Sequence, residues 1–178
     1  KSLGTGVDPL GLIEKYGADA TRFGMIWQSL GNQDIHWSEE HVLAGKKFCN
    51  KIWNASRFVL QNVNLNFKSK ISNLKLKTKN LTVADKKILD ELKKTIKEVG
   101  NGIEKYEFGK ALHKLYDFFW HDFCDTYIEA AKYQLSNAKY QMSTQRILFY
   151  VLSDSLKLLH PFIPFITEEI WSQSNKDL

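Results

Sequence analysis

The stretch of sequence that decides the fold runs from Glu39 to Asn62 and reads EEHVLAGKKFCNKIWNASRFVLQN. Its apolar and small residues recur every three or four positions, which is the period of an amphipathic α-helix. Ser38, directly before it, is a typical N-cap residue. A helix with one apolar side is stable when that side packs against other helices, so the stretch predicts a helical bundle. The residues on the predicted buried side are Gly45, Phe48, Cys49, Ile52, Ser56, Val59 and Leu60.

Further amphipathic segments lie on both sides of this helix, and Asp8 and Thr82 stand as caps before two of them. The predicted helices are 9–16, 19–29, 83–104, 107–133, 142–159 and a last one that begins at Pro164. The positions expected to be buried in them are Ile88, Leu92, Ile96, Val99, Ile103, Phe108, Leu112, Leu115, Phe119, Phe123, Leu148, Val151, Leu152, Ser155 and Leu159.

The segments between the predicted helices are polar. Residues 63–80 and 134–141 are expected to be connections, and residues 34–37 at most a short extended piece. Three prolines and ten glycines in 178 residues leave few helix breakers. The sequence therefore predicts an all-α fold, in which a short helical segment over residues 1–30 precedes an antiparallel helical bundle over residues 31–178.

Composition argues against several classes of protein. No apolar run reaches the ~18 residues that a membrane span needs. The chain starts at Lys1 without an apolar signal segment, so neither secretion nor a membrane partner is expected, and the start is expected to be the cut end of a longer chain. The chain has two cysteines, Cys49 and Cys124, and two are too few to build a disulfide framework. This low number favours a protein of the reducing cytoplasm.

The charges are unevenly distributed along the chain. The whole chain carries +5, yet no Asp or Glu occurs between His41 and Ala84, so the rest of the chain is net acidic. A block of one sign favours a polyanionic partner such as nucleic acid. The lysines between residues 68 and 79 would also suit a solvated loop. The nine cations of the block are Lys46, Lys47, Lys51, Arg57, Lys68, Lys70, Lys75, Lys77 and Lys79.

One side of the 39–62 helix offers the chemistry of an RNA contact. Cations bind phosphates, amides read base edges, and an indole ring can stack on an unpaired base. The alternatives are that Trp53 packs against another helix, that the amides bond the backbone, and that Arg57 is buried against Asp125 or Glu129. The candidate RNA-binding residues are Lys46, Asn50, Trp53 and Arg57 on one face, with Lys47, Lys51 and Asn54 in the adjacent row.

No catalytic or metal site is predicted. His121 and Cys124 are one helical turn apart and Cys49 could approach them in space, but a zinc site needs about four ligands and the neighbours are aromatic, so packing is the expected role. No phosphate loop, nucleophile elbow or catalytic dyad occurs, so the chain is expected to bind without itself catalysing. An acidic patch is expected to face solvent or to pair with lysines: Asp122, Asp125 and Glu129.

Several blocks of the chain resemble class I aminoacyl-tRNA synthetases, and among them the valyl-tRNA synthetases. The resemblance to the region at the end of the KMSKS signature is carried by KSLGTGVDP (1–9) and YGADATRF (16–23). The valyl type is carried by GNQDIHW (31–37), FCNKIWNASRF (48–58) and FWHDFCDTYIE (119–129). The closing helix of the family's bundle is similar to LHPFIPFITEEIW (159–171). The resemblance covers nearly the whole chain.

The resemblance implies the anticodon-binding part of a valyl-tRNA synthetase, an enzyme that attaches valine to its tRNA with ATP. Lys1 and Ser2 correspond to the end of the KMSKS signature and would contact ATP in the complete enzyme. Because the catalytic and editing domains are absent, we expect the fragment to hold no cofactor and to be inactive alone. It is expected to bind valine-accepting tRNA as a cytoplasmic monomer, beside the remaining domains of the same polypeptide. The alternatives are the same part of an isoleucyl- or leucyl-tRNA synthetase, or a helical interaction scaffold.

Overall fold

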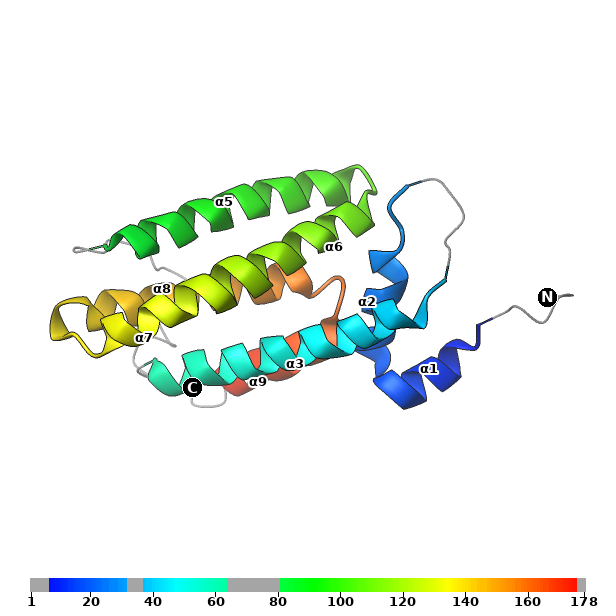
Figure 1. Cartoon of the computed structure of the whole chain (residues 1–178), viewed down its shortest axis with the longest axis horizontal. Coiled ribbons are helices and arrows are strands. Elements are labelled where there is room, and N and C mark those ends of the chain that lie inside the picture. Colours follow the sequence, from blue (N-terminus) through cyan, green and yellow to red (C-terminus); the bar gives the residue numbers. More distant parts are fainter. Residues whose placement is uncertain (1–6, 32–36, 64–80, 176–178) are drawn as a thin grey trace, which may run out of the picture.

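The computed structural model describes residues 7–31, 37–63 and 81–175, and the regular structure within these ranges is entirely helical (Figure 1). The all-α prediction is confirmed for this part of the chain. The predicted extended piece at 34–37 lies outside the described residues, apart from Trp37, which is in no strand. None of the described helices combines the length and the apolarity that crossing a membrane would need.

The helices run up and down the long axis of the molecule, so that successive long helices are antiparallel (Figure 1). In chain order they are α1 (Pro9–Tyr16), α2 (Ala18–Trp27), α3 (Glu39–Asn62), α5 (Val83–Glu104), α6 (Phe108–Asp117), the π-helical segment η2 (Phe118–Ile128), α7 (Glu129–Leu135), α8 (Ala138–Leu159) and α9 (Pro164–Asn175). In this view α3, α5 and the run from α6 to α7 form the front layer, and α8 and α9 lie behind it.

The caps that the sequence predicts are present at the starts of three helices. The Asp8 side chain accepts hydrogen bonds from the first backbone N–H groups of α1, and Ser38 Oγ accepts one from Glu40 N at 3.3 Å. Thr82 and Asp85 form a reciprocal capping box at the start of α5. Three of the predicted helix starts are therefore confirmed by the hydrogen bonds that create them.

The long predicted helix at 107–133 is a continuous helical run, but its middle is not α-helical. The segment η2 has the wider π-helical turn, and Thr126 Oγ1 donates to the carbonyl of His121 at 2.9 Å, five residues earlier. A π-turn holds more residues than an α-turn, so it changes which side chains face the core. The predicted helix over 107–133 is therefore confirmed as a helical run, and its π-helical middle is a feature that the sequence did not predict.

The predicted connection at 134–141 is shorter than expected. α8 begins at Ala138 and not at residue 142, and the Asn137 side chain caps it by accepting a hydrogen bond from Lys139 N at 3.0 Å. The polar residues at the start of α8 suggested a loop, but they are the exposed first turn of a helix with a good N-cap. The prediction of a long polar connection is therefore wrong.

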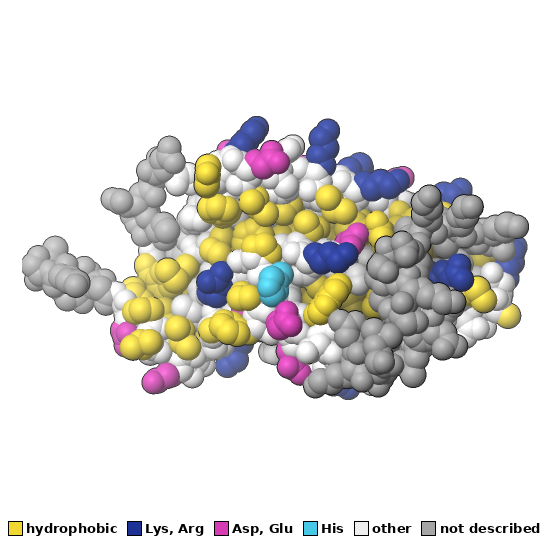
Figure 2. All heavy atoms as spheres, turned by 180° about the vertical axis from the view of Figure 1, so that it is seen from behind, with side chains coloured by type: hydrophobic (Ala, Val, Ile, Leu, Met, Phe, Trp, Pro, Cys, Tyr) yellow, Lys and Arg dark blue, Asp and Glu magenta, His cyan; other side chains and the backbone are white. Residues whose placement is uncertain are grey.

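A single apolar core runs along the bundle and contains most of the predicted positions, among them Phe48, Ile52 and Leu92. Two of the predicted positions are exposed instead, Ile96 at 38% and Phe108 at 41%. On α5 the buried side of the helix includes Thr95, which is 1% exposed. Ile96, the next residue, therefore lies at the margin of that buried side. Seen from behind, the molecule shows a band of hydrophobic side chains, with Lys and Arg along its upper edge and others scattered over the rest of this face (Figure 2).

Two glycines bring α2 close to α3. A Cβ at Gly45 would lie 2.8 Å from the carbonyl oxygen of Ala20, and one at Gly24 would lie 2.8 Å from the backbone of Val42. Only glycine permits this approach of the two backbones. The short N-terminal helices are therefore packed directly on the bundle, with Phe23 of α2 fully buried in its core.

Polar side chains of α2 also hold the turn between α8 and α9. Asp19 accepts hydrogen bonds from the backbone N–H groups of Phe165 and Ile166 at 3.2 and 2.7 Å, at the start of α9. Arg22 donates to the carbonyls of Pro161 and Phe162 at 2.9 and 3.0 Å. These contacts join segments at opposite ends of the described sequence.

Candidate nucleic-acid interface

The structure places most of the candidate RNA-binding residues on one open side of α3. This side is opposite the buried stripe that contains Phe48 and Ile52, and no acidic residue of α3 follows Glu40. The exposed side therefore offers cations and amides together, in the arrangement that helical spacing predicts. The candidates exposed on it are Lys46, Lys47, Asn50, Asn54 and Arg57.

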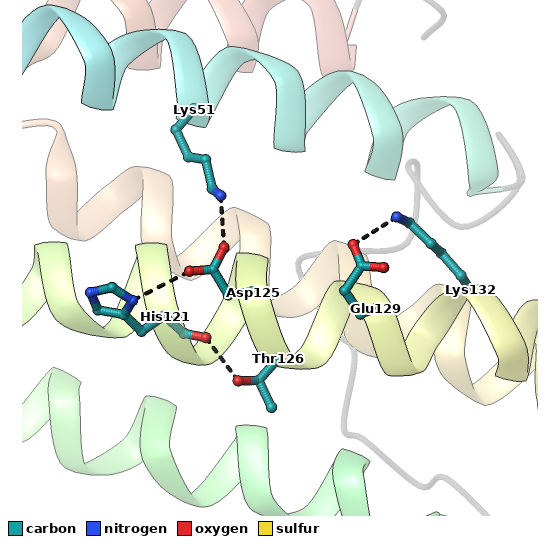
Figure 3. Close-up of polar contacts among 6 residues, drawn as sticks. All are labelled: Lys51, His121, Asp125, Thr126, Glu129 and Lys132. Carbon is teal, nitrogen blue, oxygen red and sulfur yellow. Dashed lines mark hydrogen bonds and ion pairs between the residues drawn. The ribbon is translucent and has the colours of Figure 1, made fainter.

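Lys51 lies at one margin of this side and is half-buried against η2 (Figure 3). Its Nζ donates to Asp125 Oδ1 at 2.7 Å and lies 4.8 Å from the centroid of the Trp120 ring. The hydrogen bond from Lys51 holds the pKa of the Asp125 carboxyl below its usual value, and the His121 Nδ1, 3.3 Å from Oδ2, acts in the same direction. Lys51 thus joins two helices as well as bordering the candidate surface.

Trp53 lies at the opposite margin of the candidate surface. Its ring is half-buried and packs against the core, so only part of it is open to a ligand. On the same helix, Lys46 Nζ lies 5.8 Å from the centroid of the ring of Tyr16, the last residue of α1. The sequence held no signal for that contact because it is made between separate helices.

Arg57 is exposed and is not the buried partner of an acidic residue. The two carboxylates considered for that role are held by lysines: Asp125 by Lys51, and Glu129 by Lys132 at 2.7 Å (Figure 3). The alternative in which Arg57 pairs with Asp125 or Glu129 is therefore wrong, while the expectation that these carboxylates pair with lysines is confirmed.

The two thiols are packed side chains and not reactive groups. Burial raises the pKa of Cys49 from 9.0 to about 12, with a smaller contribution from the charge of Asp19, and burial likewise raises the pKa of Cys124 to about 12. His121, in contrast, is exposed and contacts Asp125. Within the described residues, no group of three or more His, Cys, Asp or Glu side chains could hold a metal ion.

The raised thiol pKa values predict a loss of stability at alkaline pH. Below pH 9 both states keep the thiol protons, whereas above it the unfolded chain releases them and the folded chain retains them until about pH 12. The free energy of unfolding should therefore fall on the order of 2 kcal/mol per thiol between pH 9 and pH 11.

Urea unfolding followed by circular dichroism, repeated from pH 8 to pH 11, measures this slope. The double variant Cys49→Ala, Cys124→Ala is less stable at pH 8 because it leaves cavities, but its stability should decline less steeply with pH. Equal slopes in the two proteins would contradict the assignment to the thiols.

Comparison with known proteins is consistent with this picture. The family described as the anticodon-binding domain of tRNA ligase matches residues 85–178. The chain is 49% identical over 173 residues to the valine–tRNA ligase of Clostridium tetani, and 46% identical to that of Thermotoga maritima. These alignments cover 96% and 97% of this chain and 19% of each relative, so the chain spans about a fifth of the length of these ligases.

Solved structures share the fold at lower identity. A leucyl-tRNA synthetase of Agrobacterium radiobacter, in a ternary complex with tRNA and LeuAMS, matches with a TM-score of 0.71 at 22% identity, over 98% of this chain and 20% of that one. The methionyl-tRNA synthetase of Mycobacterium tuberculosis bound by methionyl-adenylate matches with a TM-score of 0.72 at 20% identity, over 97% and 35% of the two chains. The helical fold of this chain is therefore shared with these two synthetases. Because the family match spans more than half of the sequence, the chain belongs to the family of anticodon-binding domains of tRNA ligases.

Proposed function

We propose that this chain is the tRNA-binding helical bundle of a valine–tRNA ligase, and that the exposed side of α3 contacts the anticodon arm of valine-accepting tRNA. The observation that carries the proposal is the identity of about half the residues to valine–tRNA ligases along 96% of the chain. The leucyl-tRNA synthetase, at 22% identity, gives the leucyl alternative much weaker support.

The chemistry of the α3 surface supports an RNA ligand. Lys46, Lys47 and Arg57 would bind phosphates, and Asn50 and Asn54 would read the edges of unpaired bases. From the margins of the surface, Trp53 would stack on a base or ribose and Lys51 would add positive potential near its pair with Asp125.

In this proposal the bundle positions the tRNA and a separate catalytic domain performs the chemistry. Residues 1–30 would connect the two parts, and residues 31–178 would bind tRNA. Lys1 and Ser2, which lie outside the described residues, would contact ATP in the complete ligase. ATP supplies the activation of valine there, and the chain alone would act as an inactive, cytoplasmic, monomeric RNA-binding module without a metal.

A binding measurement with matched tRNAs tests the proposal. Fluorescence anisotropy is recorded with a valine-accepting tRNA transcript and with the same transcript carrying another anticodon. The chain should bind the first more tightly. Equal affinity for the two transcripts would show that the chain does not recognise the anticodon. If the chain bound neither transcript, the alternative of a helical interaction scaffold would be favoured.

Arg57→Ala should weaken binding of the valine tRNA by about 5- to 150-fold, because it removes a phosphate or base contact worth ~1–3 kcal/mol. Its thermal unfolding midpoint should stay close to the wild-type value, since Arg57 is exposed. Lys47→Ala should weaken binding to both tRNAs and reduce the slope of log K against log salt by about 1.

Lys93→Ala is the matched control, because the Lys93 side chain is 77% exposed on α5, away from the α3 surface. It should leave the affinity for the valine tRNA unchanged. If Lys93→Ala and Lys47→Ala lower the affinity for tRNA equally, the tRNA is attracted to the positive charge of the whole chain, and α3 is not the binding site.

A further inference from the structure

The turn between α5 and α6 contains a strained residue. Tyr106 has φ 59°, and it is the only non-glycine residue with positive φ in the described part of the chain. Its N–H donates to Ile103 O at 3.1 Å and the N–H of Glu107 donates to Gly102 O at 2.7 Å, which closes the end of α5. The position that follows a helix in this way is usually glycine, because a Cβ destabilises the left-handed conformation.

The packing of the Tyr106 side chain does not explain why tyrosine occupies this position. The residue is 81% exposed, and among the described residues its ring packs only against Phe108, edge-on at 6.1 Å between centroids and itself 41% exposed. A strained residue that gains little from burial is unfavourable for the fold alone. Strain of this kind is a reason to look for a function of the side chain.

Tyr106 lines a depression in the surface that also contains two lysines. A depression of about 460 Å³ is lined by Lys105, Tyr106, Phe108 and Lys110 from the turn and by Ser29 and Leu30 from the end of α2. Among the described residues of this lining, Glu107 is the single acidic one, and it pairs with Lys110 at 2.7 Å. Exposed aromatic rings beside lysines form a surface on which nucleobases stack and phosphates bind.

The turn is held rigidly against α2. Gly109 leaves no room for a side chain, because a Cβ there would clash with the carbonyl oxygen of Ser29. One turn further along α6, His113 Nε2 lies 3.1 Å from Trp27 O, and the two rings stack with centroids 3.5 Å apart. The turn therefore presents Tyr106 at the end of the bundle next to α2, where α3 also begins (Figure 1).

We propose that this turn is a second RNA-binding site, in which an unpaired nucleobase stacks on Tyr106 and its flanking phosphates bind Lys105 and Lys110. The site rests on the proposed function and extends it, because the same tRNA would contact both α3 and the α5–α6 turn. The exposed rings favour RNA over an acidic protein surface, since they offer stacking, while Lys105 and the Glu107-paired Lys110 offer phosphate contacts.

The variant Tyr106→Gly separates binding from folding. Glycine relieves the left-handed strain, so the thermal unfolding midpoint of the chain should rise by about 2–4 °C. The same variant loses the stacking surface, so the dissociation constant for the valine tRNA transcript should increase at least about fivefold. A variant that is more stable but binds more weakly cannot owe its weaker binding to misfolding.

Two further variants check the chemistry of the site. Tyr106→Phe keeps the ring and should keep most of the affinity, while Lys105→Gln should reduce the salt slope of binding by about 1. Phe165→Ala is the control, because Phe165 is an exposed aromatic residue, at 64%, in the first turn of α9. It should leave the affinity for the transcript unchanged.

The outcomes distinguish the two proposals. If Arg57→Ala weakens binding and Tyr106→Gly does not, the second site is wrong and the α3 surface stands. If Tyr106→Gly weakens binding and Arg57→Ala does not, the α3 surface is wrong and the turn is the RNA-binding site. If the wild-type chain does not bind the transcript, both proposals are wrong, and a lower unfolding midpoint in Tyr106→Gly would overturn the argument from strain.

Discussion

Asp85→Ala is expected to lower the free energy of unfolding by about 3 kcal/mol. The variant loses a helix cap, and it leaves the buried hydroxyl of Tyr127 without a hydrogen-bond partner. Asp85 is fully buried, and its Oδ2 accepts a hydrogen bond from Thr82 N at 2.8 Å. Its Oδ1 accepts a second bond, also 2.8 Å, from the hydroxyl of Tyr127 in η2. One carboxylate therefore caps α5 and joins it to the opposite helix.

Tyr127, the partner of Asp85, keeps its hydroxyl proton to a higher pH than an exposed tyrosine would. Burial, and then the neighbouring charge of Asp85, raise the pKa of the Tyr127 hydroxyl far above its usual value. The hydroxyl remains a donor to Asp85 throughout the physiological range of pH. Asp85→Ala leaves that donor without its partner inside the core, which is the larger part of the expected loss.

Urea unfolding measures the effect, and two variants control it. Asp90→Ala removes a carboxylate from the same helix whose side chain is 67% exposed, and should change stability by less than about 0.5 kcal/mol. Tyr127→Phe removes only the hydroxyl and should cost about 1–2 kcal/mol. Equal effects of Asp85→Ala and Asp90→Ala would show that the buried hydrogen bonds contribute little.

Gly45→Val is expected to destabilise the chain by about 3 kcal/mol or more, because it forces side-chain atoms into a closely packed helix pair. The first added atom would already lie 2.8 Å from the carbonyl oxygen of Ala20 and 2.8 Å from the ring of Phe23. Neither the backbone of α2 nor the fully buried ring of Phe23 can move without disturbing the core. The N-terminal helices should therefore loosen from the bundle.

Gly100→Val is the matched control for this substitution. Gly100 also lies inside a long helix, α5, but a Cβ there meets no atom within 4 Å. Valine and glycine differ little in helix propensity, so the expected change is within about 0.5 kcal/mol. Thermal unfolding of both variants, with proteolysis to locate any loosened segment, decides the result. A Gly45→Val protein as stable as the wild type would mean that α2 does not pack on α3 as described.

Local rules were sufficient for most of the helices. The period of apolar residues and the caps Asp8, Ser38 and Thr82 placed the starts of α1, α3 and α5 correctly, because both signals act within one helical turn. The open side of α3, with Lys47 and Arg57, followed from the same period, since residues three or four apart share a face in any α-helix.

The same rules could not place the middle of the α6–η2–α7 run. A π-helical turn satisfies the same backbone groups as an α-turn, and packing against neighbouring helices decides between them. Ile96 and Phe108 were misplaced for a related reason. A margin position on a helix is buried only if another element lies over it, and the sequence of one helix does not contain that information.

The sequence by itself determined the helical class, the caps and the residues that share the open side of α3. The tertiary structure decided how those residues are used. It joined Lys51 to Asp125 across 74 residues, left Arg57 free of both carboxylates considered for it, and placed Tyr106 in a left-handed turn beside α2. The physical reason is one of range: helix periodicity and capping act between near neighbours in the chain, whereas ion pairs, burial and backbone strain depend on which distant segments meet.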